Sequence, residues 1–330
     1  MAENFKYTVC TQCFTYNQKQ YILDALNGFV MQETSFPVVS VIVDDASTDN
    51  EPTVILDFLN NNFRINDSSI AYQEETDYGR IYYAQHKTNE NCYFAIVLLK
   101  ENHYSKKKKK APYISQWTDN SKYIALCEGD DYWTDPHKLQ KQVVFLESHP
   151  DFSMCFHAAQ ILHQGVRQDK TGAECESIEE REYFSTEVFA RWYVPTASIV
   201  YRRVPVEKFP IKHHDWPTRG DIVLVLRCTH TGRIFGMQEK MSVYRMQPNS
   251  VSHNSLYRGK EVFDLPNHFR CIYLNFPKVE KEPVVWCISH AYYSRMKQDK
   301  TLFQKLRDFI LFVYWDPKFA SQKIKSYLKR

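Results

Sequence analysis

Long apolar runs are absent from this sequence of 330 residues. The longest apolar stretches, Phe94–Leu99 and Phe309–Trp315, fall well short of the roughly 18 to 20 residues that a membrane-spanning helix needs. A signal-peptide core is also missing from the first residues, which lead directly into a strand-like run. We therefore expect a cytosolic protein, or one that binds a membrane peripherally.

An excess of one charge is missing as well. The 42 basic and 39 acidic residues give a formal net charge of only +3, so nucleic-acid binding through a general basic field is not expected. Neither a Gly/Ser-rich linker nor an internal repeat interrupts the chain, and 43% hydrophobic and 15% aromatic residues are ample for a large core. We predict one continuous domain, residues 1–253, followed by a helical extension, residues 254–330.

The cysteines offer no clear metal-site or disulfide pattern. They number nine, and most of them stand inside apolar runs, which is typical of reduced thiols in a core. Cys10 and Cys13 have the spacing of a redox pair or half of a zinc site, but no second pair of Cys or His follows at a zinc-site spacing. We interpret both as core residues.

The first third of the chain predicts alternating strands and helices. A strand is expected at Lys6–Cys13, and apolar residues at helical spacing follow from Tyr21 to Val30, with Asn17 as the N-cap. The β-branched run Val38–Val43 predicts a strand buried on both faces. It ends at the acidic turn Asp44–Asp49, and Asn50 and Pro52 then signal another helix. This order of elements is typical of a parallel sheet with right-handed crossovers.

The rest of the chain continues the α/β pattern. The run of five lysines at Lys106–Lys110 predicts a solvated loop, with contact to acceptor phosphates or anionic lipid as the alternative. Further strands are expected at Ser68–Glu74, Tyr93–Lys100, Phe152–His157, Thr196–Tyr201 and Arg233–Arg245, a polar loop at Gly165–Glu182, and helices at Pro136–Ser148, Glu187–Trp192, Ile222–Thr229 and from Asn254 onward.

A cluster of carboxylates directly follows the apolar run Tyr123–Leu126. Glu128, Asp130 and Asp131 fall within four positions, at the expected carboxyl end of a buried strand, where open α/β sheets bind ligands. Acids this close would repel one another unless a cation neutralised them, so a hard divalent ion such as Mg²⁺ or Mn²⁺ is expected there. Asp135 is better explained as the N-cap of the next helix.

With these motifs in this order, the chain resembles the inverting glycosyltransferases of family 2, which have the GT-A fold. The similarity covers residues 6 to 253. Its motifs are Thr15-Tyr16-Asn17, Val43-Asp44-Asp45-Ala46-Ser47-Thr48-Asp49, Glu128-Gly129-Asp130-Asp131, Gly220-Asp221, Tyr244-Arg245 and Pro248-Asn249-Ser250-Val251-Ser252. The resemblance implies a Rossmann-like, mostly parallel sheet flanked by helices. It also implies an enzyme that transfers a sugar from a nucleotide-diphosphate sugar, UDP- or GDP-linked, with Mg²⁺ or Mn²⁺ at the diphosphate.

The resemblance also assigns roles to individual residues. Asp221 would be the general base that takes the proton of the acceptor hydroxyl. Asp130 would be the main metal ligand, Asp131 a second ligand or a support, and Glu128 a contact to ribose or donor sugar. The remaining donor-site residues would be Thr15, Tyr16, Asn17, Asp44, Asp45 and Arg245, with Thr15, Tyr16 and Asp45 around the base and ribose.

Three positions depart from the family pattern. Phe14 stands where proline is common, and Glu128 replaces the usual first aspartate of the Asp-x-Asp motif. Gln247 stands where a histidine often follows Tyr-Arg, so His253 is considered as a metal or diphosphate contact in its place.

Two other function classes compete with this interpretation. A sugar-nucleotide pyrophosphorylase should have a glycine-rich phosphate loop after the first strand, and the sequence has none there. The other rival is a carbohydrate-binding relative without turnover, which would not need all the acidic positions. The context that the resemblance suggests is polysaccharide or lipid-linked oligosaccharide assembly at a bacterial cell envelope. The acceptor would be a saccharide or lipid-linked hydroxyl, with association of several copies and peripheral membrane contact left open.

Overall fold

The computed structural model describes residues 5–163, 173–190, 193–212, 219–247, 255–298 and 301–328. The strands in these ranges are β1 (Tyr7–Thr15), β2 (Val38–Asp44), β3 (Ala71–Glu75), β4 (Gly79–Gln85), β5 (Cys92–Leu99), β6 (Ser121–Leu126), β7 (Tyr132–Trp133), β8 (Phe152–His163), β9 (Arg181–Tyr183), β10 (Val200–Arg202) and β11 (Arg233–Met246). The α-helices are α1 (Ile22–Val30), α2 (Glu51–Asn62), α3 (Ala111–Thr118), α4 (Lys138–Ser148), α5 (Ser185–Ala190), α6 (Arg203–Glu207), α7 (Gly220–Thr231), α8 (Ser255–Asn275), α9 (Lys281–Gln298), α10 (Leu302–Trp315) and α11 (Pro317–Leu328).

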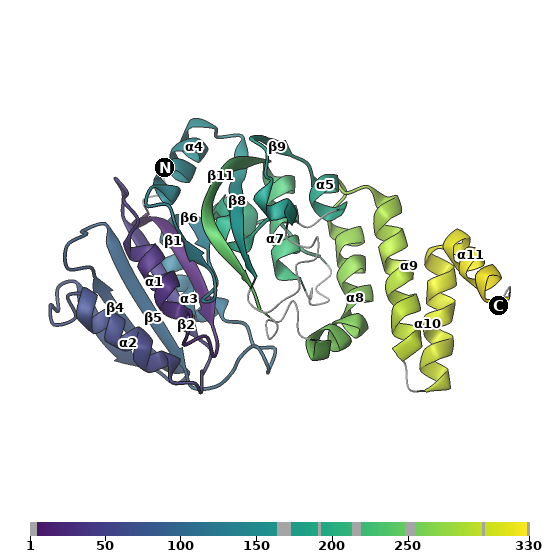
Figure 1. Ribbon diagram of the computed structural model, residues 1–330, viewed down its shortest axis with the longest axis horizontal. Coiled ribbons are helices and arrows are strands. Elements are labelled where there is room, and N and C mark those ends of the chain that lie inside the picture. The colour runs from purple at the N-terminus through teal and green to yellow at the C-terminus, as the bar shows by residue number, and fades with distance from the viewer. Residues whose placement is uncertain are drawn as a thin grey trace.

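All eleven of these strands belong to one sheet. Its order is β3-β4-β5-β2-β1-β6-β10-β8-β11-β7, with β9 paired to β11 (Figure 1). Helices flank the sheet, and α8 to α11 extend from one end of it, so the predicted α/β class with a C-terminal helical part is confirmed. The sheet is parallel only where β5, β2, β1 and β6 adjoin and where β11 meets β8, and antiparallel pairs make up the rest.

The parallel strands bring their carboxyl ends to one edge of the sheet. Thr15 on β1 lies opposite Asp44 on β2, which lies opposite Leu98 on β5. On the other side of β1, Gln12 lies opposite Leu126 of β6. The three turns after β1, β2 and β6 therefore meet at this edge, which we call the carboxyl edge.

Two apolar clusters form the core, one on each face of the sheet. Every residue of β2 is buried, as its β-branched sequence predicts. Cys10 belongs to one cluster and Cys13 to the other, because their positions along the strand point to opposite faces. The two thiols cannot act together, and all nine cysteines are free, as expected.

Several element boundaries differ from the sequence prediction. Asn17 is not an N-cap, because α1 begins at Ile22 with Tyr21 as its N-cap. Asp135 precedes the N-cap of α4, which is His137, and its carboxylate accepts a hydrogen bond from the backbone N–H of His137 at 2.7 Å. Residues Thr196–Ser198 form a short 3-10 helix, and β10 begins only after it. The strand β4 was not predicted.

The C-terminal helices pack against the sheet domain through α7. A third apolar cluster joins Ile222 and Leu226 of α7 to residues of α8, α9 and α10, including Ile272, Ile288 and Phe312. None of the helices in the described ranges is long and apolar enough to cross a membrane. A domain boundary at residue 253 stays a prediction.

Candidate active site

The turn after β6 touches the end of β1 at a glycine. A Cβ on Gly129 would lie 2.6 Å from Oε1 of Gln18 and would also collide with the Thr15 side chain. Only glycine permits this close approach, so the Glu128-Gly129-Asp130-Asp131 motif is fixed against the Thr15-Tyr16-Asn17 motif. Two of the sequence motifs are thereby brought together.

Glu128 carries the most exposed carboxylate of this turn. Its side chain reaches solvent, yet protein surrounds it at the centre of the carboxyl edge. This desolvation, together with the negative charges of Asp130 and Asp221, raises the pKa of Glu128 to about 8, and Lys110 opposes the shift. No side-chain donor in the described residues forms a hydrogen bond to the Glu128 carboxylate, which is therefore available to a ligand.

Asp130 and Asp131 are placed differently, although they are adjacent. Asp131 is buried, and its carboxylate accepts the backbone N–H of Arg245 at 2.9 Å, which ties the turn to β11. Asp130 is partly buried, and its carboxylate accepts a hydrogen bond of 3.3 Å from the Gln247 amide. Desolvation raises the pKa of both carboxyls, and the charge of Asp130 adds to the shift of Asp131. The geometry suits Asp131 as a support and leaves Asp130 for a cation.

The sequence analysis assigns Arg245 to the donor site. In the structure, its side chain supports the turn after β6. Its buried guanidinium donates to the backbone carbonyl of Asp130 at 2.7 Å and pairs with Asp24. It also lies 4.4 Å from the ring centroid of Tyr132. These contacts position Asp130 and partly offset the charge of the acidic cluster.

The side chain of Asp45, in the turn after β2, anchors the loop that follows β5. Its buried carboxylate accepts the backbone N–H groups of His103 and Tyr104 at 2.8 and 3.0 Å, and it pairs with Lys110 at 2.8 Å. The geometry therefore gives Asp45 a structural task besides the predicted contact to base and ribose. It also shows that the lysine run is not a free polycation, because Lys106 and Lys108 pair with Glu101.

Asp44 is better placed than Asp45 to receive a ligand. One of its carboxylate oxygens accepts the Ser47 N–H at 3.0 Å. The other is buried and has no hydrogen-bond partner among the described residues. Desolvation raises the pKa of Asp44, as expected for a buried acid with an unsatisfied oxygen.

A pocket of about 360 Å³ opens beside Asp44. Its walls combine apolar side chains with the basic residues Arg80 and Lys100. The full lining is Asp44, Ala46, Ser47, Pro52, Arg80, Leu98, Leu99 and Lys100. Arg80 comes from β4, an element that the sequence analysis missed, so its proximity to Asp44 could not be predicted.

Glu51 is a buried acid that the sequence analysis did not single out. Its carboxylate accepts hydrogen bonds from the Thr15 hydroxyl, from the Gln18 N–H at 2.8 Å and from the Ser47 hydroxyl at 3.0 Å. Desolvation raises its pKa. Glu51 thus joins the turn after β1 to the turn after β2. The only signal in the sequence was an acid in the first turn of a helix that follows an acidic loop.

Tyr16 and Asn17 occupy the tip of the turn after β1. Asn17 has a positive φ of 53°, and its side-chain oxygen accepts the Thr48 N–H at 2.7 Å. The Tyr16 side chain is exposed. Asn17 therefore shapes the turn, whereas Tyr16 projects from it and is free to stack on a ligand.

Lys110 is the last residue of the lysine run for which the sequence analysis predicted a solvated loop, and for this residue the prediction is wrong. Its amine lies 5.4 Å from the ring centroid of Phe14, and its side chain is mostly buried. It pairs with Asp45 and lowers the pKa of Glu128, so it stands between the turns after β2 and β6. This is the position where a cation would meet an anionic ligand.

Asp221 reaches the same edge from a distant part of the sequence. It lies in the first turn of α7, where the helix dipole stabilises a carboxylate, and it is partly buried. Its charge contributes to the raised pKa of Glu128, as does the charge of Asp130. Glu128 therefore lies within electrostatic range of both Asp130 and Asp221.

The residues fit a divalent cation with few protein ligands. No group of three or more His, Cys, Asp and Glu side chains converges as a metal cage in the ranges that the structure describes. Mg²⁺ sites that also use substrate phosphates need only one or two carboxylates, and Asp130 could supply one. His253 lies outside the described residues, so its suggested role stays a prediction.

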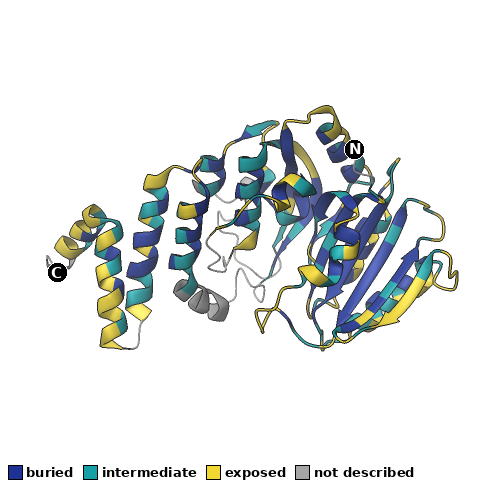
Figure 2. Cartoon of the chain, turned by 180° about the vertical axis from the view of Figure 1, so that it is seen from behind, coloured by how far each residue is buried: buried dark blue, intermediate teal, exposed yellow. Residues whose placement is uncertain are grey.

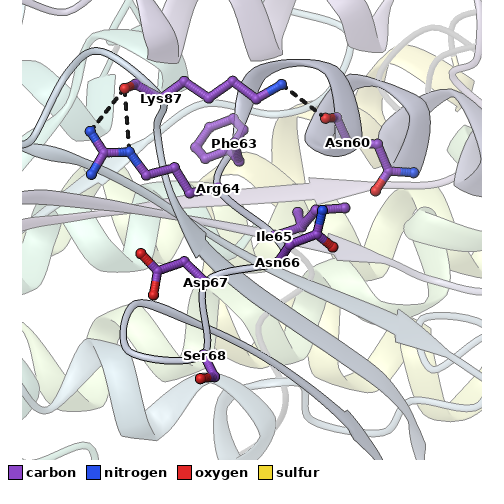
Figure 3. Close-up of a pocket in the computed structure, with 8 residues that line it drawn as sticks. All are labelled: Asn60, Phe63, Arg64, Ile65, Asn66, Asp67, Ser68 and Lys87. Atoms are coloured by element: carbon purple, nitrogen blue, oxygen red, sulfur yellow. Dashed lines mark hydrogen bonds between the residues drawn. The ribbon is translucent and has the colours of Figure 1, made fainter.

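A larger pocket, of about 620 Å³, lies at the opposite end of α2 (Figure 3). Its lining is Asn60, Phe63, Arg64, Ile65, Asn66, Asp67, Ser68 and Lys87. Arg64 donates to the backbone carbonyl of Lys87, and the Lys87 amine donates to that of Asn60, so both cations are used within the protein (Figure 3). With α2 about 18 Å long, this pocket is remote from the carboxyl edge.

Comparison with known sequences finds relatives of uncertain activity. No family model matches the chain. Over 261 residues it is 31% identical to uncharacterized proteins of Mycobacterium tuberculosis and Mycobacterium bovis, which covers 77% of this chain and 63% of theirs. Over 236 residues it is 24% identical to an uncharacterized glycosyltransferase of Nostoc, covering 70% of this chain and 62% of that protein. The chain thus spans a little over three fifths of the length of these relatives.

Comparison with solved structures identifies the fold. Residues 1–349 of TarS from S. aureus, in complex with UDP-GlcNAc, superpose with a TM-score of 0.57 at 12% identity, over 95% of this chain and 82% of that fragment. A mannosyltransferase from Pyrobaculum calidifontis in complex with GDP-Man and Mn²⁺ gives a TM-score of 0.52 at 14% identity, over 98% of this chain and 85% of the other. The chain has the α/β fold of these glycosyltransferases.

Proposed function

We propose that the chain is a metal-dependent, inverting glycosyltransferase that moves a sugar from a nucleotide-diphosphate sugar to a hydroxyl group. The observation that carries this proposal is that Glu128, at the carboxyl edge, lies within electrostatic range of both Asp130 and Asp221. Asp221 is separated from the other two acids by about ninety residues of sequence, and neither local packing nor helix capping requires all three. The glycosyltransferase fold and the Nostoc relative support the same reaction class.

Asp221 is the proposed general base. Its carboxylate would accept the proton of the acceptor hydroxyl while the hydroxyl oxygen bonds to the anomeric carbon of the donor. The bond from that carbon to the diphosphate breaks on the opposite face, and its electron pair leaves with the nucleoside diphosphate, which inverts the anomeric configuration. A positioned base of this kind typically contributes about 10²- to 10⁴-fold to the rate.

The pocket beside Asp44 is the proposed site of the nucleobase. One buried oxygen of Asp44 is unsatisfied among the described residues and can accept a single N–H, while Arg80 can donate to a carbonyl oxygen. The Lys100 amine already donates to the Thr76 carbonyl at 2.6 Å and pairs with Glu75. Uracil presents one N–H between two carbonyls, whereas guanine presents N–H and amino donors side by side that suit a carboxylate with both oxygens free. This chemistry favours a UDP-linked donor, and Tyr16 is placed to stack on the base or ribose.

Lys110 and Asp130 are the proposed contacts to the donor diphosphate. Lys110 would meet its charge directly, and Asp130 would hold Mn²⁺ or Mg²⁺, with Arg245 and Asp131 keeping the turn in place. A divalent cation at this position would supply Lewis-acid stabilisation of the leaving diphosphate. Glu128 would contact the ribose or the donor sugar, and the acceptor would be a saccharide or a lipid-linked hydroxyl.

The test compares Asp221→Asn with a matched acid. Glu282 also stands in the first turn of a helix, α9, and is exposed, so Glu282→Gln is the control. Release of nucleoside diphosphate from UDP-GlcNAc, UDP-glucose, UDP-galactose and GDP-mannose is measured with Mn²⁺. We expect Asp221→Asn to reduce the rate on the preferred donor by about 10²- to 10⁴-fold, to leave donor affinity unchanged, and Glu282→Gln to behave as wild type.

Two outcomes would count against this function. Full turnover in Asp221→Asn would remove that residue as the base. Donor binding without turnover by the wild type, with water or any offered saccharide, would favour a carbohydrate-binding relative.

A further inference from the structure

The last long helix of the chain exposes an apolar face. Five side chains on α10 are between 57% and 82% exposed: Leu302, Phe303, Leu306, Ile310 and Tyr314. At 100° per residue they fall within one broad stripe on the helix surface. In Figure 2 this helix is among the most exposed segments at the end of the molecule farthest from the sheet. An apolar patch of this extent on a soluble protein marks an interaction surface.

The opposite face of α10 is firmly attached to the protein. Phe312 and Asp308 are buried, and Asp308 pairs with Arg295 and Arg307. The hydroxyl of Ser289 on α9 donates to the Phe312 carbonyl at 2.9 Å, and Thr301 closes a capping box at the start of the helix. The exposed stripe is therefore presented by an ordered helix and is not turned inward.

The exposed charged side chains on α10 and α11 are basic: Lys305, Arg307, Lys318 and Lys325. Asp308 on α10 is buried and paired, and Asp316, between the two helices, accepts the Phe319 N–H at 2.9 Å. The surface thus combines an apolar stripe with flanking positive charge.

We propose that the outer face of α10 docks on an anionic membrane surface. An apolar stripe with aromatic residues and flanking lysines is the composition of helices that lie in the bilayer interface, where anionic headgroups attract the lysines. With a length of about 21 Å, α10 lies along the surface and does not cross it. A second copy of the chain is a less suitable partner than a membrane. A two-fold symmetric interface would bring the same basic residues of both copies close together, where they repel each other.

The experiment is flotation of the full chain with vesicles, without any nucleotide sugar. Two vesicle compositions are compared: phosphatidylcholine alone, and phosphatidylcholine mixed with phosphatidylglycerol. We expect the wild type to float with the anionic vesicles and to lose most of this binding with neutral vesicles or at high salt. Phe303→Ser combined with Ile310→Ser should reduce partition at least tenfold, whereas Val144→Ser, which changes an exposed apolar residue on α4, should have no effect.

A second variant tests the contribution of positive charge. Lys318→Glu combined with Lys325→Glu should remove the preference for anionic vesicles and leave the thermal unfolding midpoint unchanged. The proposal is overturned if the wild type does not float, or if the Phe303 and Ile310 variant floats like the wild type. Sedimentation equilibrium supplies the third check: a dimer that this variant dissociates, without a change in vesicle binding, would assign the face to a second copy. None of these results depends on sugar transfer.

Discussion

The two acidic turns at the carboxyl edge follow neighbouring parts of the sheet but use their carboxylates in opposite ways. In the turn after β2, Asp45 accepts two backbone N–H groups and pairs with Lys110, and Glu51 accepts three hydrogen bonds. In the turn after β6, the Asp130 carboxylate accepts a 3.3 Å hydrogen bond from Gln247, and Glu128 accepts none from the side chains that the structure describes. Asp45 and Glu51 therefore hold the first turn, whereas Glu128 and Asp130 are placed to meet a ligand.

This difference distinguishes acids that stabilise the fold from acids that are available to bind a ligand. A buried carboxylate with all its acceptor sites used stabilises the fold. Like charges that lie close together with few donors oppose folding, so they persist where a ligand or a cation compensates them. Changes at Asp45 and Glu51 should therefore alter stability, and changes at Glu128 and Asp130 should alter binding.

The largest effect on stability is expected from Glu51→Ala. The substitution leaves the Ser47 hydroxyl and the Gln18 N–H without their acceptor and removes the contact of the Thr15 hydroxyl to Glu51, so two turns lose their link. We expect the free energy of unfolding to fall by about 3 kcal/mol, measured by urea denaturation. Glu51→Gln, which keeps the shape and one acceptor oxygen, should lose less. A Glu51→Ala protein as stable as the wild type would contradict the structural role of this turn.

A smaller effect, on binding, is expected from Lys110→Met, because Lys110 stands between the two turns. Asp45 keeps both backbone donors in the variant, so the unfolding midpoint should change little. Affinity for UDP in the presence of Mn²⁺ should fall about tenfold, as for the loss of one charge-assisted hydrogen bond. Lys108→Met is the control, since Lys108 pairs with Glu101 on the surface. Equal affinities of the two variants in calorimetry would remove Lys110 from the donor site.

The smallest effect is the pH dependence that Glu128 contributes in the metal-free protein. Its pKa of about 8 in the folded protein exceeds the ordinary value of 4.5, so the folded protein holds a proton that the unfolded chain has released between these pH values. The free energy of unfolding should therefore decrease as the pH rises through this window. Glu128→Gln should reduce the slope.

The control for this experiment is Glu101→Gln. Lys106 and Lys108 hold the pKa of Glu101 at about 2, so this acid is ionised throughout the same window in the folded state. Thermal unfolding in EDTA across the window compares the three proteins. If the stability of Glu128→Gln depends on pH as steeply as that of the wild type, the pKa of Glu128 is not raised in the folded protein.

Much of this arrangement could be predicted from the sequence. The strands at β1, β2 and β6 follow from hydrophobic pattern, and strands that end in acids imply an edge where those acids meet. The direction of individual side chains could not be predicted. Asp44 and Asp45 are adjacent, and only the fold shows that one faces a pocket and the other a loop.

Other features required tertiary structure. Glu51 looks like an ordinary acid at a helix start, and its three partners come from other parts of the chain. The apolar stripe Leu302, Phe303, Leu306 and Ile310 is visible in the sequence, but the sequence does not show which face of the helix packs against the rest of the protein. In the structure, Asp308 and Phe312 are the buried residues of this helix.

The most direct measurement is calorimetric titration of UDP, UDP-sugars and GDP-mannose, with and without Mn²⁺, into the wild type and Asp130→Ala. Asp135→Ala is the matched control, because Asp135 lies nearby and pairs with Lys141 on the surface. We predict Mn²⁺-dependent binding of uridine nucleotides to the wild type and the control, and none to Asp130→Ala. Absence of nucleotide binding by the wild type, or equal binding by Asp130→Ala, would contradict a metal-dependent donor site at the turn after β6.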